Sequence, residues 1–178
     1  MVFRASSVFG RFASIALALC LCCGTARAQA IEIVALGASN TWGKGVSRTQ
    51  AFPAHLERML RARGLAVRVR NAGINGNTTG QMLARLGSVV GPRTRLVILQ
   101  PGGNDRRRGI SRDERRANVR EIRGRLRQRG IAVVMLRNRL IGDVARSHAR
   151  PDGQHFLPAG YKALAARLLP VVLSKLGH

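Results

Sequence analysis

The chain has 178 residues, enough for one ordinary domain, and its 31 lysine and arginine residues against 8 acidic residues give a net charge of +23. Such a charge would suit a nucleic-acid-binding protein. The arginines are nevertheless spread along the whole chain, and only 4% of the residues are aromatic, too few for a base-stacking surface. The composition therefore argues against nucleic acid as a partner and predicts a solvated basic surface that attracts anionic lipid or cell-envelope polymers weakly.

Residues 1–30 have the pattern of a secretory signal. Arg4 and Arg11 form a basic start, an apolar stretch follows, and small residues around Ala28 offer a cleavage site. The apolar stretch has about 12 residues, whereas a membrane span needs about 20. All three cysteines lie in this segment. We therefore expect a periplasmic or secreted protein of residues 31–178, a single domain without disulfides.

The first half of this domain alternates strand and helix. Residues 31–36 form a short apolar run that ends at a glycine, which predicts a buried strand. Apolar side chains at helical spacing after Pro53 predict a helix that Gly64 ends. Valine and arginine alternate over residues 67–69, which indicates a half-exposed second strand, and the stretch 79–90 is typical of a helix.

The second half repeats the pattern. Residues 96–99 are continuously apolar, as central parallel strands tend to be. A capping-box pattern at Ser111 predicts a helix that extends to residue 129, and the run 131–136 predicts a fourth strand. The stretch 158–176 is helical in pattern, with a kink expected at Pro170. This alternation predicts a three-layer α/β/α domain with a doubly wound parallel sheet and right-handed crossovers.

Four polar loops follow these elements and could meet in space. The carboxyl ends of parallel strands share one edge of a sheet, where open α/β folds build their sites. Ser39 lies in the first of these loops, and a serine hydroxyl needs an adjacent base to act as a nucleophile. In Asp152-x-x-His155 both side chains come from one turn, so the carboxylate can orient the imidazole while Nε2 faces the serine.

The remaining two loops offer hydrogen-bond donors. A tetrahedral intermediate of acyl transfer carries an oxyanion, which fixed N–H groups stabilise. Gly76 lets its backbone approach a ligand closely, and Asn104 can donate from its side-chain amide. Asn and Gly are also ordinary turn residues, but three such loops at matched positions favour a site.

These motifs resemble the SGNH hydrolases, also called the GDSL esterase/lipase family, and within them the periplasmic thioesterase/lysophospholipase/arylesterase type. The resembling blocks, in chain order, are 34–39, 71–79, 102–105 and 152–155. The resemblance implies a flavodoxin-like strand order, Ser39 as nucleophile, His155 as general base and Asp152 as its orienter. It also implies an oxyanion hole made of the Ser39 N–H, the Gly76 N–H and the Asn104 side chain.

Two features depart from the family pattern. Ala38 stands where the family has an acidic residue before the serine, which removes a carboxylate that braces the loop. The stretch 137–151 is short where relatives fit another helix and strand, so we expect no regular fifth strand. The loss of both elements would leave a shallow, open cleft unless Leu140, Ile141 and Val144 rebuild an apolar wall.

The other histidines carry less weight. His148 is an alternative base near Asp143, His55 is expected to be partly exposed on a helix, and His178 is terminal. No motif indicates a metal or a nucleotide, so we expect no cofactor.

The sequence therefore predicts a monomeric serine esterase that hydrolyses small carboxylic esters or thioesters, and lysophospholipids, through an acyl-enzyme on Ser39. Two alternatives remain open: a carbohydrate O-acetyl esterase on the same residues, and an inactive relative that binds polyanions.

Overall fold

The structure, a computed structural model, describes residues 30–178. The expected secretory signal thus lies outside the described residues, apart from Ala30. The elements in the first half are β1 (Ile31–Gly37), α1 (Ser39–Trp42), η1 (Arg48–Gln50), α2 (Phe52–Arg61), β2 (Val67–Gly73), α3 (Thr79–Ala84) and α4 (Leu86–Val89). Those in the second half are β3 (Thr94–Leu99), α5 (Asn104–Arg107), α6 (Arg112–Gln128), β4 (Ala132–Met135), α7 (Asn138–His148) and α8 (Pro158–Leu176).

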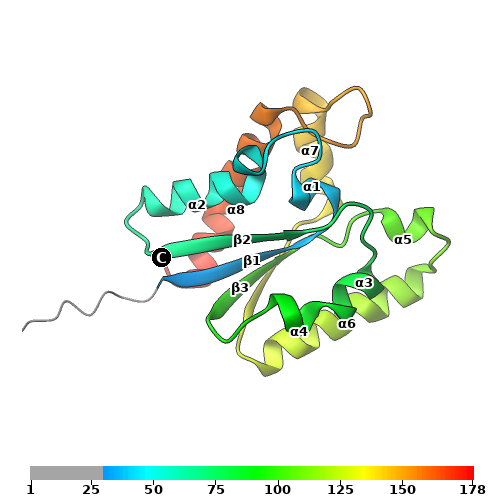
Figure 1. Ribbon diagram of the computed structural model, residues 1–178, viewed down its shortest axis with the longest axis horizontal. Coiled ribbons are helices and arrows are strands. Elements are labelled where there is room, and N and C mark those ends of the chain that lie inside the picture. Colours follow the sequence, from blue (N-terminus) through cyan, green and yellow to red (C-terminus); the bar gives the residue numbers. More distant parts are fainter. Residues whose placement is uncertain (1–29) are drawn as a thin grey trace, which may run out of the picture.

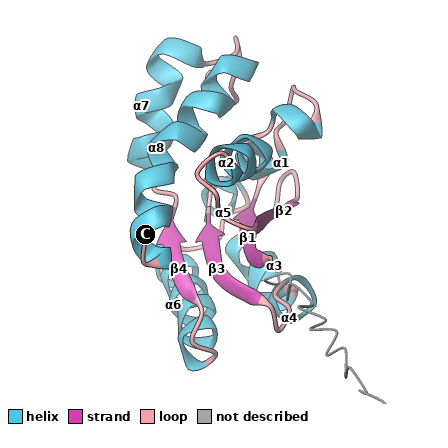
Figure 2. Cartoon of the chain, turned by 90° about the vertical axis from the view of Figure 1, so that its left-hand side faces the viewer, coloured by secondary structure: helices cyan, strands magenta, loops and turns pink. Residues whose placement is uncertain are grey.

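The four strands form one parallel sheet in the order β2-β1-β3-β4, which confirms the predicted sheet. The strands end nearly level, because Gly37 pairs with Gly73 and Leu99 pairs with both Leu36 and Met135. The arrowheads of β3 and β4 accordingly point the same way in Figure 2. All four following loops therefore leave from one edge.

Helices cover both faces of the sheet, as the three-layer prediction requires. Along β1, successive side chains point to opposite faces, so Ile33 and Ala35 pack with α2 and α8 whereas Val34 and Leu36 pack with α3, α4 and α6. Figure 1 shows these two groups of helices on either side of the strands. All four of these β1 side chains are fully buried. The central strand is therefore held by two separate hydrophobic cores.

Two predicted elements differ in detail from the structure. The single helix expected over 79–90 is two helices, α3 and α4, which break at Arg85. The side chain of Arg85 turns back and donates to Asn77 Oδ1 at 2.8 Å and to the Gly37 carbonyl at 3.2 Å. These contacts tie Arg85 to the sheet edge in place of a regular helical turn. The second strand, in turn, extends further than residues 67–69 and continues to Gly73.

The stretch 137–151 contains a helix but no strand. The sheet of the described residues has four strands, so the expectation that a regular fifth strand is missing is confirmed. The expected loss of a helix is wrong, because α7 occupies Asn138–His148. Val144 of α7 is buried in the same hydrophobic core as residues of α8, and this contact anchors α7 to the domain. The final helix, α8, continues through Pro170 as one element.

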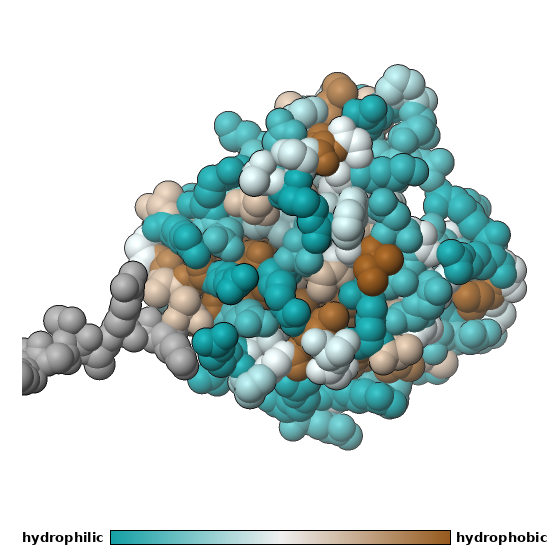
Figure 3. Space-filling view, in the orientation of Figure 1, coloured by the Kyte–Doolittle hydropathy of each residue, from teal (hydrophilic) through white to brown (hydrophobic). Residues whose placement is uncertain are grey.

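The outer surface is strongly polar. The face seen in Figure 3 is mostly hydrophilic, with hydrophobic residues in separate patches. Within residues 30–178, no helix is both long and apolar enough to cross a membrane.

Candidate active site

Ser39 is the first residue of α1, directly beyond the end of β1. The short helix is held against the end of β2 by a close backbone approach at Gly73. A Cβ on Gly73 would lie 2.2 Å from the Trp42 nitrogen, so a larger residue would push α1 away from the sheet. Backbone packing at Gly73 therefore helps to fix the position of the serine.

A continuous hydrogen-bond chain joins the three predicted catalytic side chains. His155 Nε2 lies 2.9 Å from Ser39 Oγ, and His155 Nδ1 lies 2.6 Å from Asp152 Oδ2. A carboxylate only accepts, so Nδ1 carries the proton and Nε2 is left to accept from the serine hydroxyl. Ser39 and His155 are 116 residues apart, yet the fold places them in direct contact.

Asp152 and His155 belong to one tight turn, as the sequence predicts. The turn is closed by an antiparallel bridge between Ala149 and Phe156 and by a bond of 2.8 Å from the Arg150 N–H to the His155 carbonyl. Phe156 is fully buried and packs edge-on against Tyr161, with ring centroids 5.2 Å apart. The histidine is therefore anchored through the aromatic residue that follows it.

The carboxylate of Asp152 is held in its charged form. Its Oδ2 accepts from the imidazole, and its Oδ1 accepts from the backbone N–H groups of Gln154 and His155, each at 2.9 Å. The bond from His155, followed by the two backbone bonds, holds the pKa of Asp152 far below its usual range. Asp152 therefore stays ionised while an imidazole titrates.

Asn104 begins α5 and lines the same cavity as Ser39 and His155. Its side-chain Nδ2 donates to the Asn77 carbonyl at 3.0 Å, and its Oδ1 accepts from Arg107 Nη1 at 3.0 Å. These two bonds fix which way the amide faces. One N–H of the amide remains for a group in the cavity.

Gly76 is placed less directly. It adopts a left-handed conformation, with φ of 73°, in a turn that a 3.2 Å bond from the Asn77 N–H to the Ile74 carbonyl closes. Gly76 directly precedes Asn77, whose carbonyl accepts the hydrogen bond from Asn104. Gly76 is not among the residues that line the cavity of Ser39. The structure thus brings Ser39, Asp152, His155 and Asn104 together, with Gly76 one residue away.

Asp105 joins the loops of Gly76 and Asn104. It is fully buried, accepts from the Thr79 N–H at 3.2 Å and also accepts from the Thr79 hydroxyl. Because Thr79 opens α3 just after the Gly76 turn, this contact sets the distance between the two loops. The sequence marks Asp105 as part of a motif without indicating this role.

Gln100 braces the loop that carries Ser39, and the sequence analysis did not identify it. Its Oε1 accepts from the Ala38 N–H at 3.0 Å and from Thr41 Oγ1 at 2.9 Å. The side chain is buried and also lines the cavity. An amide oxygen just beyond the end of β3 thus supplies the bracing acceptor that Ala38 cannot. A polar residue directly after the apolar run 96–99 was the signal that could have indicated this role.

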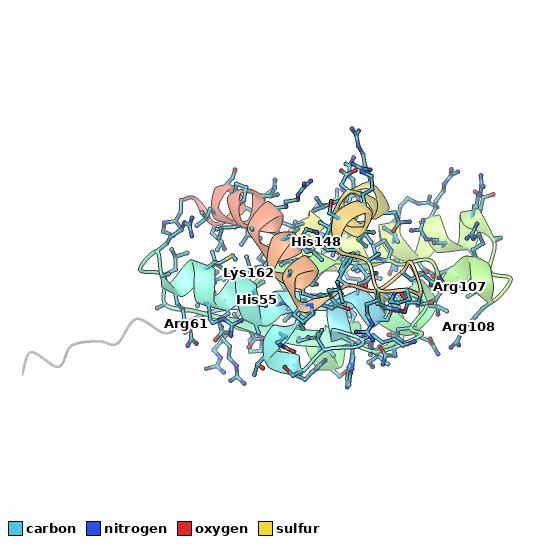
Figure 4. The ribbon with its side chains drawn as sticks, turned by 90° about the horizontal axis from the view of Figure 1, so that it is seen from above. His55, Arg61, Arg107, Arg108, His148 and Lys162 are labelled. Carbon is cyan, nitrogen blue, oxygen red and sulfur yellow. The ribbon has the colours of Figure 1, made fainter. Side chains whose placement is uncertain are left out.

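Arg107 links the loop of Asn104 to the turn that carries His155. Besides Asn104, it binds the Gln154 side chain, while the Gln154 carbonyl accepts from Asn40 Nδ2 at 3.1 Å. Figure 4 shows Arg107 and Arg108 together at the α5 end of the molecule. The residues that flank Ser39, Asn104 and His155 therefore form one connected polar frame.

The cavity beside Ser39 has a volume of about 250 Å³, and α7 forms one wall of it. Ile141, Gly142 and Ala145 of α7 line this wall. Leu140 and Val144, which the sequence offered as wall residues, pack into the hydrophobic core instead. Of the three predicted residues, only Ile141 contributes directly to the cavity.

His148, the alternative base, and His55 both lie elsewhere. His148 packs against Gly160, and its Nδ1 is buried without a hydrogen-bond partner among the described residues, while Asp143 pairs with Arg146. His55 accepts from Arg58 at 2.9 Å, and burial, followed by the charges of Arg58 and Lys162, lowers its pKa. Neither histidine contacts Ser39, and Figure 4 shows His55 far from the α5 end.

Comparisons with known proteins show which family the chain resembles. An esterase named TesA from Pseudomonas aeruginosa is 33% identical over 121 residues, which are 67% of this chain and 59% of that protein. An arylesterase from Vibrio mimicus is 33% identical over 132 residues, or 73% of this chain and 64% of that protein. The match thus spans less than two thirds of either relative.

Among solved structures, AlinE4, an SGNH-hydrolase family esterase, is 31% identical with a TM-score of 0.56, covering 83% of this chain and 72% of that one. The sequence model of the GDSL-like lipase/acylhydrolase family matches residues 35–173 of this chain. This range includes all five predicted site residues. The chain therefore belongs to the GDSL-like lipase/acylhydrolase family, as its motifs predict.

Proposed function

We propose that this protein is a serine ester hydrolase that acts on small carboxylic esters or thioesters through an acyl-enzyme on Ser39. The observation that carries the proposal is the hydrogen-bond chain from Ser39 Oγ through His155 to Asp152, at 2.9 and 2.6 Å. In such a chain the histidine takes the proton of the serine hydroxyl, and the carboxylate orients the histidine and stabilises its charged form.

In the first half of the reaction, His155 Nε2 takes the proton of Ser39 Oγ as the oxygen attacks the ester carbonyl carbon. The resulting imidazolium is stabilised by the ionised Asp152 at Nδ1. The tetrahedral oxyanion receives hydrogen bonds from the Ser39 N–H, the Gly76 N–H and the free N–H of Asn104. The intermediate then collapses, His155 returns the proton to the departing alcohol or thiol, and the acyl group stays on Ser39.

In the second half, a water takes the place of the leaving group. His155 removes its proton, the hydroxide attacks the acyl carbon, and the same donors hold the oxyanion. The carboxylic acid departs as Ser39 Oγ recovers its proton from His155. Atoms and charges balance with water as the only added reactant.

The substrate class follows from the cavity and from the relatives. A space of about 250 Å³ beside Ser39 suits a short acyl group, since drug-sized ligands occupy about 300–1,000 Å³. The relatives named above are an esterase and an arylesterase. We therefore expect aryl acetates and short thioesters to be good substrates, and lysophospholipids to be accepted less well.

Hydrolysis of 4-nitrophenyl acetate by three alanine variants tests the proposal. We expect Ser39→Ala and His155→Ala to lose nearly all activity, on the order of 10⁶-fold in kcat, as removal of such groups does elsewhere. His148→Ala is the matched control, because it removes a histidine that does not contact Ser39, and it should retain activity. Activity of Ser39→Ala within tenfold of the unsubstituted enzyme would overturn the assignment.

We also propose that residues 1–30 direct export and are removed. The support is their sequence pattern of a basic start, an apolar stretch and small residues. Amino-terminal sequencing of the protein from a cell fractionation would test it. A mature chain that begins near residue 31 in the periplasm or medium is expected, and an intact chain in the cytoplasm would contradict it.

A further inference from the structure

The cavity of Ser39 shares lining residues with two neighbouring cavities. It shares Gly102, Gly103 and Asn138 with a second cavity of about 410 Å³. The second shares Arg115 and Asn138 with a third of about 390 Å³. The second and third cavities lie next to each other along α6 and are called here the arginine groove. The arginine groove therefore lies next to the cavity of Ser39.

Arginine dominates the sides of this groove. The second cavity is lined by Arg106, Arg112 and Arg115, and the third also by Arg116, Arg120, Arg123 and Arg137. In the part of the chain that the structure describes, Arg116 alone among them lies within 4.0 Å of a carboxylate, the exposed Asp113 at 3.5 Å. The groove therefore concentrates positive charge that the protein itself does not neutralise.

The floor of the groove is apolar. Ile110 lies in the second cavity, and Pro101, Val119 and Met135 lie in the third. Along α6, the arginines from Arg112 to Arg123 extend over about 16 Å at the usual rise of a helix. An apolar floor beneath a cationic rim fits an arm that is itself apolar and ends in an anion.

We propose that the arginine groove binds an apolar arm of the substrate that ends in a carboxylate or phosphate, so that the preferred esters are amphipathic anions. Guanidinium groups bind both kinds of anion in bidentate fashion. A neutral ester of equal length contacts the same apolar residues but forms no charge-assisted hydrogen bonds with the arginines. This inference rests on the proposed esterase function, since it places the scissile ester at Ser39.

Chain length and charge can be varied separately to test the groove. The substrates are 4-nitrophenyl half-esters of succinic, adipic, suberic and sebacic acids, each compared with the 4-nitrophenyl alkanoate of equal chain length. We expect similar kcat/KM for the shortest pair and at least about a tenfold preference for the charged ester once the arm reaches the arginines, as charge-assisted bonds allow. Equal kcat/KM for charged and neutral esters at every length would overturn the proposal.

Matched variants separate the groove from overall charge. Arg116→Gln/Arg120→Gln/Arg123→Gln removes three groove cations, whereas Arg68→Gln/Arg127→Gln/Arg167→Gln removes three exposed cations that line none of these cavities. Arg115 is kept in both because it donates to the Gly102 carbonyl. The preference for charged esters should vanish in the first triple variant and persist in the second. An equal loss in both would mean that net charge alone attracts the substrate.

Binding without turnover distinguishes failure of this inference from failure of the esterase proposal. Titration calorimetry with suberate should show binding to the unsubstituted protein and the control triple variant, and at least about tenfold weaker binding to the groove variant. No binding of suberate to the unsubstituted protein would contradict the groove even if neutral esters are hydrolysed. Suberate binding without hydrolysis of any ester would instead contradict the esterase and leave the groove supported.

Discussion

The side-chain Oε1 of Gln100 accepts the Ala38 N–H at 3.0 Å, although the two residues are 62 positions apart. This bond and the one from Thr41 fasten both sides of Ser39 to the end of β3. The fold thus compensates for the missing acidic residue at position 38 with an acceptor from a neighbouring strand.

Gln100→Ala should lower kcat by about tenfold while KM changes little, because Ser39 loses its fixed geometry but the cavity walls remain. The unpaired Ala38 N–H should also cost about 1–3 kcal/mol in the free energy of unfolding. Gln100→Glu keeps an acceptor at the same place and should restore much of kcat. Steady-state kinetics beside chemical denaturation would measure both effects, and a loss in Gln100→Glu as large as in Gln100→Ala would show that Gln100 does not act as an acceptor.

Asn104→Ala should lower kcat by about 10²–10³-fold with a smaller change in KM, since one oxyanion donor is removed. Arg107→Ala should have a milder effect of the same kind, because Asn104 loses the partner that orients its amide. A change confined to KM in Asn104→Ala would place Asn104 in substrate binding rather than in stabilisation of the oxyanion.

Asp152→Asn should lower kcat by about 10⁴-fold, because the amide can favour the wrong imidazole tautomer. In the unsubstituted enzyme, hydrogen bonds depress the pKa of Asp152, so its contribution to stability is fully present above the unfolded-state value of about 3.9 and is lost only as pH falls through the lower folded value. We therefore expect Asp152 to add no protonation step of its own to the profile of kcat/KM near neutral pH. His148→Ala should leave this profile unchanged, and a shifted profile would implicate the other histidine.

Tyr161→Phe should reduce the free energy of unfolding by about 1 kcal/mol without changing kcat, because the hydroxyl donates to the Lys44 carbonyl at 3.0 Å. Burial raises the pKa of Tyr161 to about 12. The folded state thus favours the neutral phenol, and this contribution is present below the unfolded value of about 10 and lost as pH rises toward 12. Between these values the variant should lose stability less steeply than the unsubstituted protein in denaturant titrations at several pH values.

The strands and the pairing of Asp152 with His155 could be predicted from the sequence, because each depends on residues that are close together in the chain. A continuously apolar run such as 96–99 predicts a buried strand. Asp152 and His155 are only three positions apart, so their side chains can meet within one turn. The matching of four loops then follows from the parallel sheet, which carries Ser39 and Asn104 to the same edge.

Contacts between segments that are distant in the sequence could not be predicted from the sequence. Nothing local to Gln100 indicates that its oxygen meets Ala38, and nothing local to Arg85 indicates that it breaks a helix by reaching the Gly37 carbonyl. The stretch 137–151 was short enough to suggest that a helix and a strand were both lost. Burial of Val144 against α8 nevertheless stabilises a helix there, a tertiary effect that spacing alone cannot show.

The most direct test of the account is covalent labelling by a fluorophosphonate, followed by mapping of the modified peptide. An activated serine attacks such a probe without any assumption about the natural substrate. We expect one label per chain on Ser39, abolished in His155→Ala and retained in His148→Ala. Labelling at another residue, or labelling of Ser39 that does not depend on His155, would contradict the assignment of Ser39 and His155 as nucleophile and base.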